Sequence, residues 1–148
     1  MLKQFLNTET KTNNLDLAIL ILRIAVMAFM LTHGYPKLLK LLAGGEIKFG
    51  DPIGLGAGVT LFLAVFSEFF CSIFIGIGLG TRLAAIPLIA TMSVASFISH
   101  AGDAFGSKEK ALMYLVIYIV IFLIGSRKYS VDRLIGKSAA KTRRHSAV

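Results

Sequence analysis

The strongest constraint on this chain comes from two long stretches that carry almost no charge. From Leu83 to Gly102 there is no charged side chain, and between Ile53 and Gly80 the only one is Glu68. A run of 18 or more mostly apolar residues is typical of a transmembrane helix, because about 20 helical residues cross the hydrocarbon core. Helices at the surface of soluble proteins show an apolar period of 3.6 residues, which is missing here.

The composition supports a membrane protein. Of the 148 residues, 55% are hydrophobic and 16% are charged, whereas an ordinary soluble domain has about 25% charged residues. We therefore predict an all-α integral membrane four-helix bundle, with residues 1–14 as an N-terminal segment, 15–125 as the membrane domain and 126–148 as a basic tail. The predicted spans are Leu15–Gly34, Leu55–Gly80, Leu83–Ser99 and Lys110–Gly125.

The basic residues predict the orientation. The N-terminal segment, the turn with Arg82 and the tail hold ten lysines and arginines, and the loops on the other side hold five. By the positive-inside rule both termini are cytoplasmic. The net charge of +8 then belongs mainly to a tail that faces anionic membrane lipid, and a nucleic-acid partner is the weaker interpretation. Ser130 is expected to cap a short interfacial helix in this tail.

Glu68 lies on a stripe of small residues. Steps of four from it reach Ala64 and Thr60 in one direction and Ser72 and Gly76 in the other, and residues four apart share one helix face. Membrane helices approach one another through small residues and turn bulky ones toward lipid. Glu68 is therefore expected to point into the bundle.

Several polar residues are candidate partners of Glu68. Arg23 is about 12 Å deep and Glu68 about 20 Å deep, at 1.5 Å per residue from the cytoplasmic ends of their spans, so we predict an ion pair between them. His33 and Lys37 lie one turn apart near the outer end of the first span. Charges inside a membrane are costly and usually functional. A packing role for the ion pair and a role in binding a ligand or proton both remain open.

Other chemistry is poorly supported. Cys71 is the only cysteine, which excludes an internal disulfide and a dithiol relay within this chain. The three histidines have no metal-ligand spacing, so we predict no metal site. The glycine-rich stretches "GLGAG" and "GIGLG" lack the spacing and preceding strand of a nucleotide loop, so helix packing is the better interpretation.

Three segments resemble the DoxX family. "LRIAVMAFMLTHGYPKL" from Leu22 resembles its first span, and "SEFFCSIFIGIGLGTRLAAI" from Ser67 resembles its second-span glutamate followed by Gly-x-x-Thr-Arg. "ALMYLVIYIVIFLIGSRKYSVDRLI" from Ala111 resembles its last span and the segment that follows. The similarity runs from about Leu15 to Ile135.

The resemblance implies a fold, a location and a set of polar residues. DoxX-like proteins are bacterial four-helix inner-membrane proteins. The family is named after a subunit of thiosulfate:quinone oxidoreductase, and other relatives are linked to membrane redox complexes and oxidative-stress defence. The family-like polar residues, which are the candidate ligand-binding residues here, are Arg23, His33, Lys37, Glu68 and Arg82.

Three functions are compatible with these features. The leading hypothesis is a small subunit of a quinone-linked redox assembly, in which Glu68 is the candidate catalytic residue and carries a proton. No cofactor motif is visible, so a partner subunit would supply the electrons. The second hypothesis is a non-catalytic membrane scaffold, alone or as a homo-oligomer, whose charges only set helix register. The third is a small proton-coupled transporter, although the chain has no tryptophan for a cationic-drug cage.

The orientation leads to a first prediction. In a Cys71→Ser background, a cysteine at Lys48 should react with a membrane-impermeant thiol reagent added from the periplasmic side. A cysteine at Ser138 should react only after the membrane is opened. Labelling of the Ser138 position in intact cells would reverse the predicted topology.

Overall fold

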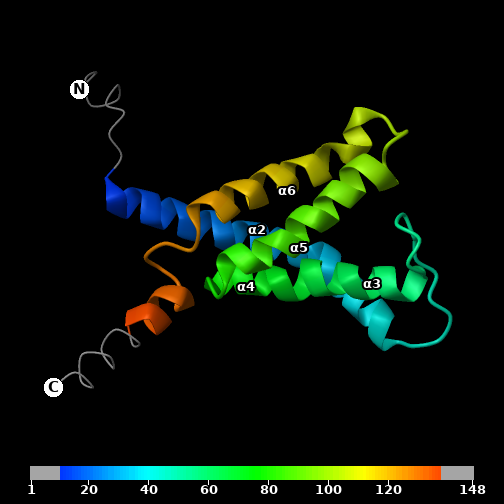
Figure 1. The fold of residues 1–148 in the computed structure, drawn as a ribbon, viewed down its shortest axis with the longest axis horizontal. Coiled ribbons are helices and arrows are strands. Elements are labelled where there is room, and N and C mark those ends of the chain that lie inside the picture. The colour runs from blue at the N-terminus through cyan, green and yellow to red at the C-terminus, as the bar shows by residue number, and fades with distance from the viewer. Residues whose placement is uncertain (1–10, 138–148) are drawn as a thin grey trace.

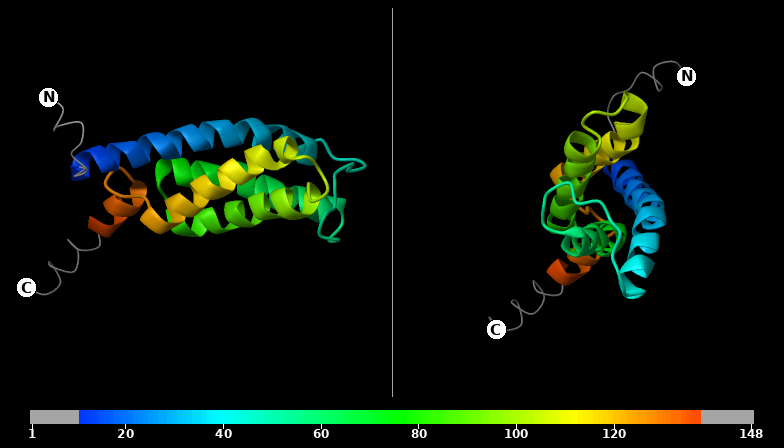
Figure 2. Two further views of the ribbon diagram at one scale, coloured as in Figure 1. Left: turned by 90° about the horizontal axis from the view of Figure 1, so that it is seen from above. Right: turned by 90° about the vertical axis from the view of Figure 1, so that its right-hand side faces the viewer.

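The computed structural model describes residues 11–137, and within this range the chain forms helices and no strand. Figure 1 and the left view of Figure 2 show the helices running roughly along one common direction, so that the molecule is elongated. The elements are α2 (Thr12–Leu42), α3 (Ala57–Val65), η1 (Phe66–Cys71), α4 (Ser72–Ile77), α5 (Thr81–Val94), η2 (Ala95–Ser99) and α6 (Phe105–Ile124). This confirms the all-α prediction.

Three helical segments within the described range are long and apolar enough to cross a membrane. They are Thr12–Leu42, Ala57–Ile77 and Thr81–Ser99. The fourth helix, α6, has 20 residues, a length of about 30 Å, and packs along α5. Its first turns carry Lys108, Glu109 and Lys110. A fourth crossing, the cytoplasmic placement of both termini and the predicted domain limits stay predictions, and residues 1–10 and 138–148 lie outside the described part.

The first helix is longer than the sequence predicted. The expected span ended at Gly34, before Pro36, but α2 continues to Leu42 with Pro36 inside it. Gly34 marks a close approach between helices instead of a helix end. A Cβ atom built on Gly34 would lie 2.7 Å from the backbone carbonyl carbon and oxygen of Glu68. The missing side chain therefore lets α2 contact the η1 backbone directly.

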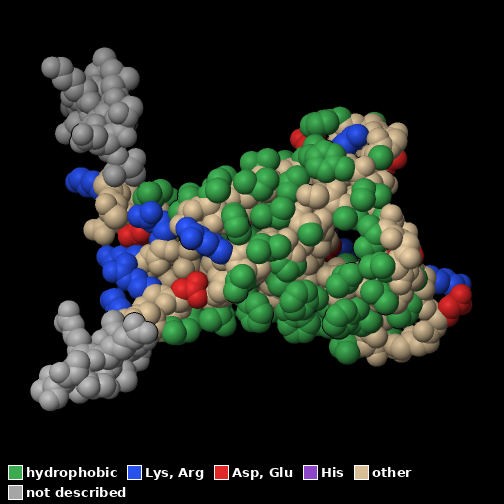
Figure 3. Space-filling model, in the orientation of Figure 1, with side chains coloured by type: hydrophobic (Ala, Val, Ile, Leu, Met, Phe, Trp, Pro, Cys, Tyr) green, Lys and Arg blue, Asp and Glu red, His purple; other side chains and the backbone are tan. Residues whose placement is uncertain are grey.

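The second span buries the predicted face. Thr60, Ala64, Glu68 and Ser72 are all less than 9% exposed, so the stripe of small residues packs inside the bundle as expected. The large side chains on the other faces are exposed, among them Phe62, Phe66, Phe70 and Ile77. In Figure 3 hydrophobic side chains cover the middle of this face of the molecule, and lysines and arginines gather toward its ends. This distribution is typical of a membrane-spanning bundle.

The segment after α6 returns to the start of α2. Arg127 Nε donates to Asp16 Oδ1 at 2.6 Å, and Lys128 contacts Asn13. Gly125 makes the turn possible because its φ of 78° and ψ of −170° lie in a region open almost only to glycine. The Ser130 hydroxyl then accepts the Arg133 amide at 3.3 Å at the start of the helical residues 131–137, which confirms the predicted cap.

The contact at Gly34 leads to a stability prediction. In Gly34→Ala the new methyl group meets backbone atoms that cannot rotate away, so we expect a loss of about 1–3 kcal/mol. Gly106→Ala is the matched control, because it is also helical and nothing lies within 4 Å of its built Cβ. Thermal unfolding in detergent measures both. Equal unfolding temperatures for the two variants would contradict the close contact.

Candidate functional site

Glu68 lies in η1, a short π-helical turn between α3 and α4. In a π-helix the backbone hydrogen bonds run from residue i to i+5, and single π-turns inside α-helices are frequent at functional sites. Glu68 is 4% exposed, and the neighbouring Ser67 is 1% exposed. The Ser67 hydroxyl lies 2.7 Å from that of Thr91 on α5. This contact fixes the turn that presents Glu68 to the bundle interior.

The carboxylate of Glu68 pairs with Lys37. The Lys37 Nζ atom lies 2.5 Å from both carboxylate oxygens. Lys37 is about one turn beyond Gly34, which contacts the backbone of Glu68, and helix side chains lean toward the N-terminus of their helix. The ammonium group therefore returns to the level of Glu68. Phe49 in the following loop lies 5.9 Å from the same Nζ, close enough for a cation–π contact.

The predicted ion pair between Arg23 and Glu68 is wrong. Gly34 is the residue of α2 that lies level with Glu68, and 11 helical residues separate Arg23 from Gly34, a distance of about 16 Å. The offset expected from the sequence, about 8 Å, is smaller because the two depths were counted from the predicted ends of the spans. Arg23 also leans toward the N-terminus of α2, away from Glu68. The ion-pair partner of Glu68 is Lys37, and not Arg23 as predicted.

Arg23 contacts backbone carbonyls instead. Its Nε and Nη2 donate to the carbonyl oxygens of Ile75 and Gly76 at 2.8 and 2.9 Å. Its Nη1 donates to the carbonyl of Ser126 at 2.5 Å. Carbonyls at the C-terminal end of a helix have no intrahelical donor, so the guanidinium satisfies the end of α4. Arg23 is 1% exposed and joins three segments of the bundle.

Glu68 also faces a pocket of about 190 Å³ between α2, η1, the junction of α5 with η2, and α6. His33 and Lys37 line it from α2, and Lys110 and Tyr114 line it from α6. The rings of His33 and Tyr114 meet edge to face, with centroids 6.1 Å apart. Of the five predicted site residues, the structure thus brings together His33, Lys37 and Glu68.

The two remaining predicted residues lie at the opposite end of the bundle. Arg23 binds the end of α4, as described, and Arg82 lies at the start of α5, where its Nη2 donates to the carbonyl of Leu123. Neither residue lines the Glu68 pocket. The five family-like residues therefore form two separate groups.

The contribution of α6 to the Glu68 pocket was not predicted from the sequence. Lys110, Tyr114 and Tyr118 follow one another at steps of four and therefore share one helix face. That spacing was the available signal in the sequence, where Lys110 marks the start of the fourth predicted span. His100 also lines the pocket, and its Nδ1 lies 2.7 Å from the Asp103 carboxylate.

The charges of the pocket lining favour an electron-rich ligand. Lys37 and Lys110 bring two positive charges and Glu68 brings one negative charge. Because Lys37 is paired with Glu68, Lys110 is the cation that a ligand oxygen could approach. Within residues 11–137 no three His, Cys, Asp or Glu side chains form a group that could hold a metal ion. The site can offer hydrogen-bond donors and exchange a proton.

The revised pairing leads to a prediction for a double-mutant cycle. Lys37→Gln and Glu68→Gln should each destabilise the protein in detergent, and together they should show a coupling of about 0.5–3 kcal/mol, because either single change leaves the other charge, buried or half-buried, without its partner. Arg23→Gln with Glu68→Gln is the control pair and should be additive to within about 0.5 kcal/mol. Chemical unfolding of the detergent-solubilised variants measures both cycles. Coupling in the Arg23 cycle alone would contradict the observed pairing.

Comparison with known proteins places the chain in a family. The DoxX family model matches residues 18–101, a range that includes His33, Lys37 and Glu68 of the pocket. An uncharacterized protein of Haemophilus influenzae is 32% identical over 121 residues, which cover 75% of this chain and 85% of that relative. No solved structure matches the chain. The resemblance in the sequence is thereby confirmed: this chain is a membrane protein that belongs to the DoxX family.

Proposed function

We propose that the chain is a small subunit of a quinone-linked redox assembly in the bacterial inner membrane, and that its Glu68 pocket holds the quinone ring. The observation that carries this proposal is a buried carboxylate that both pairs with Lys37 at 2.5 Å and lines a pocket. An ion pair used only for packing has no need of a pocket beside it. A carboxylate beside a bound ligand can exchange a proton with that ligand.

The size and lining of the pocket suit a single ring. Its volume of about 190 Å³ is smaller than the roughly 300–1,000 Å³ of pockets that enclose drug-sized ligands. A quinone ring carries two carbonyl oxygens that accept hydrogen bonds, and Lys110, His33 and His100 in the lining can donate them. The apolar chain of a membrane quinone would lie outside the pocket, along the lipid-facing surface.

Glu68 would supply protons to the ring. Reduction of a quinone to a quinol takes up two electrons and two protons, one proton at each oxygen. In this proposal Glu68 would deliver one of these protons, would be reprotonated from the loop side past His100 and Lys110, and would then deliver the second. Lys37 stabilises the carboxylate between transfers. Tyr114 orients His33 through its edge-to-face contact.

The electrons would come from a partner subunit. The single cysteine, Cys71, is buried and has no second thiol with which to form a disulfide. A partner subunit that holds a redox cofactor would supply the electrons, while this chain would bind the ring and move protons. The partner and the quinone are parts of the proposal.

A second candidate function is a non-catalytic scaffold. The observation that favours it is Arg23, whose three hydrogen bonds all end on backbone carbonyls of its own chain. Such contacts hold helices in place and leave no role for a ligand. A scaffold of this kind would recruit its partner whether or not Glu68 can ionise, which distinguishes it from the redox subunit.

The two functions predict different results for Glu68→Gln. The variant keeps the shape of the side chain but cannot release a proton. If the chain serves quinone reduction, turnover in membranes that contain the intact assembly should fall about 10²-fold or more, as for loss of a general acid. Partner pull-down and the amount of the chain in the membrane should stay close to wild type. Quinone reduction, pull-down and membrane level are measured in the same preparations.

The matched control is Glu46→Gln, which changes a glutamate whose side chain is 84% exposed and should keep full turnover. Wild-type turnover in Glu68→Gln at normal occupancy would contradict the proton role. Partner binding that survives in Glu68→Gln in proportion to the folded protein, together with no quinone-linked activity in wild-type membranes, would favour the scaffold.

A further inference from the structure

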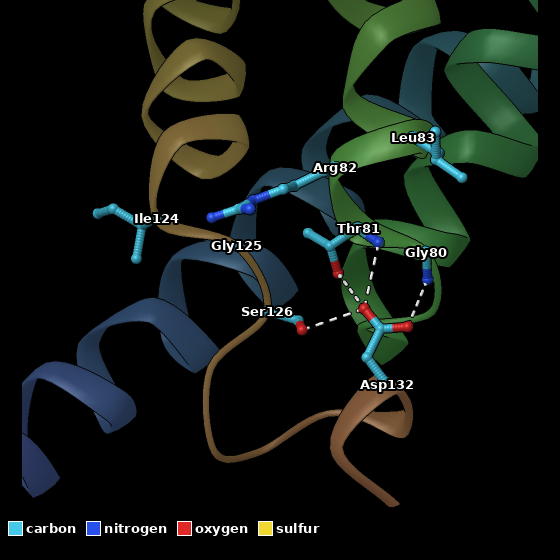
Figure 4. Close-up of a pocket in the computed structure, with 8 residues that line it drawn as sticks. All are labelled: Gly80, Thr81, Arg82, Leu83, Ile124, Gly125, Ser126 and Asp132. Atoms are coloured by element: carbon cyan, nitrogen blue, oxygen red, sulfur yellow. Dashed lines mark hydrogen bonds between the residues drawn. The ribbon is translucent and has the colours of Figure 1, made fainter. Parts of the chain in front are cut away.

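A second pocket lies at the opposite end of α5 from the Glu68 site. It has a volume of about 360 Å³ and is formed by the start of α5, the end of α6 and the segment that follows α6. Figure 4 shows how these three segments meet around Thr81, Ser126 and Asp132. The function proposed for Glu68 makes no use of this pocket.

The Asp132 carboxylate lines this pocket, and both of its oxygens already accept hydrogen bonds from the protein. Asp132 Oδ1 accepts the Gly80 amide at 2.7 Å, and Oδ2 accepts the Ser126 hydroxyl at 3.1 Å and the Thr81 amide at 3.4 Å. Burial acts to raise the pKa of the Asp132 carboxyl, but these hydrogen bonds hold its pKa below the ordinary value. Asp132 therefore stays ionised, and the first amides of α5 are already occupied.

Arg82 is the cation of this pocket. Figure 4 shows its side chain reaching from α5 across to the end of α6, near Gly125. Gly125 leaves room for it, because a Cβ atom there would lie 3.4 Å from Arg82 Nε. Among the described residues the guanidinium makes one hydrogen bond, from Nη2 to the carbonyl of Leu123 at 3.2 Å. A guanidinium has five N–H donors, so most of them remain for another acceptor.

The pocket continues onto an apolar surface. Leu83, which is 75% exposed, and Ile124 belong to its lining. Lys128 and Arg133 are exposed at the same end of the molecule, whereas Arg127 is paired with Asp16. A cation beside apolar side chains at the end of a membrane helix matches the chemistry of a phospholipid, which has a phosphate next to its acyl chains. The positive charge of Arg82 favours a lipid with net negative charge.

We propose that this pocket binds the phosphodiester group of an anionic phospholipid, with Arg82 as the phosphate ligand and with acyl chains along Leu83 and Ile124. Arginine suits this role because its planar guanidinium can bind two phosphate oxygens at once. The lipid would join the start of α5 to the end of α6 at the membrane surface. Free phosphate shares the ionic part of this chemistry but not the apolar part.

Native mass spectrometry of the full chain, released from detergent with equal amounts of phosphatidylglycerol and phosphatidylcholine, tests the proposal. Wild type should retain one phosphatidylglycerol in preference to phosphatidylcholine. Arg82→Gln should lower this retention about tenfold or more, because hydrogen bonds to charged groups are the strong ones. Arg82→Lys should fall between the two, since it keeps the charge but not the planar fork.

Lys128→Gln is the matched control, because it removes an exposed positive charge at the same end and should change retention by less than about twofold. Equal loss in Arg82→Gln and Lys128→Gln would overturn the site in favour of general surface attraction. No preference of wild type for phosphatidylglycerol would also overturn it, whether or not the variants fold. Displacement of phosphatidylglycerol by millimolar inorganic phosphate would show a site for the free anion instead of the lipid.

Discussion

The hydrogen bonds of Arg23 hold together one end of the bundle, where α2 begins and the segment after α6 lies. Inside a membrane protein, backbone carbonyls left free at a helix end have no water to bind. Arg23 supplies donors to Ile75 and Gly76 at the end of α4 and to Ser126 after α6. One side chain of α2 thereby sets the positions of two other segments. An apolar side chain of similar size would remove the Arg23 donors from all three carbonyls.

This arrangement divides the polar residues between the two ends of the bundle. At one end Arg23 and Asp132 bind mainly backbone groups of neighbouring segments. At the other end Lys37 and Glu68 bind each other and line a pocket. The first group fixes where helices begin and end. The second leaves side chains available to a ligand, and that difference is why the proposed chemistry is assigned to Glu68.

Much of the fold could be predicted from the sequence, because the length of an apolar stretch and the spacing of small residues within it can both be recognised within one segment. The stripe that contains Ala64, Glu68 and Ser72 is buried as predicted. The pairing of charges was not predictable in the same way, since it depends on the register between helices. Gly34 sets that register, because its lack of a side chain lets the Glu68 backbone come close to α2. In the sequence, however, Gly34 was predicted to be the end of a helix. The π-turn at Glu68 and the α6 lining also required the three-dimensional structure.

The ion pair between Lys37 and Glu68 also bears on how the chain enters a membrane. Each charge alone is costly to place in hydrocarbon, and the two lie on consecutive helical segments joined by residues 43–56. When α2 and the α3–η1–α4 segment enter the membrane together as a hairpin, the paired charges of Lys37 and Glu68 enter it with no net charge. The hairpin, rather than either helix, is then the unit of insertion. The loop between the two helical segments places Phe49 5.9 Å from Lys37 Nζ and so adds a contact within this unit.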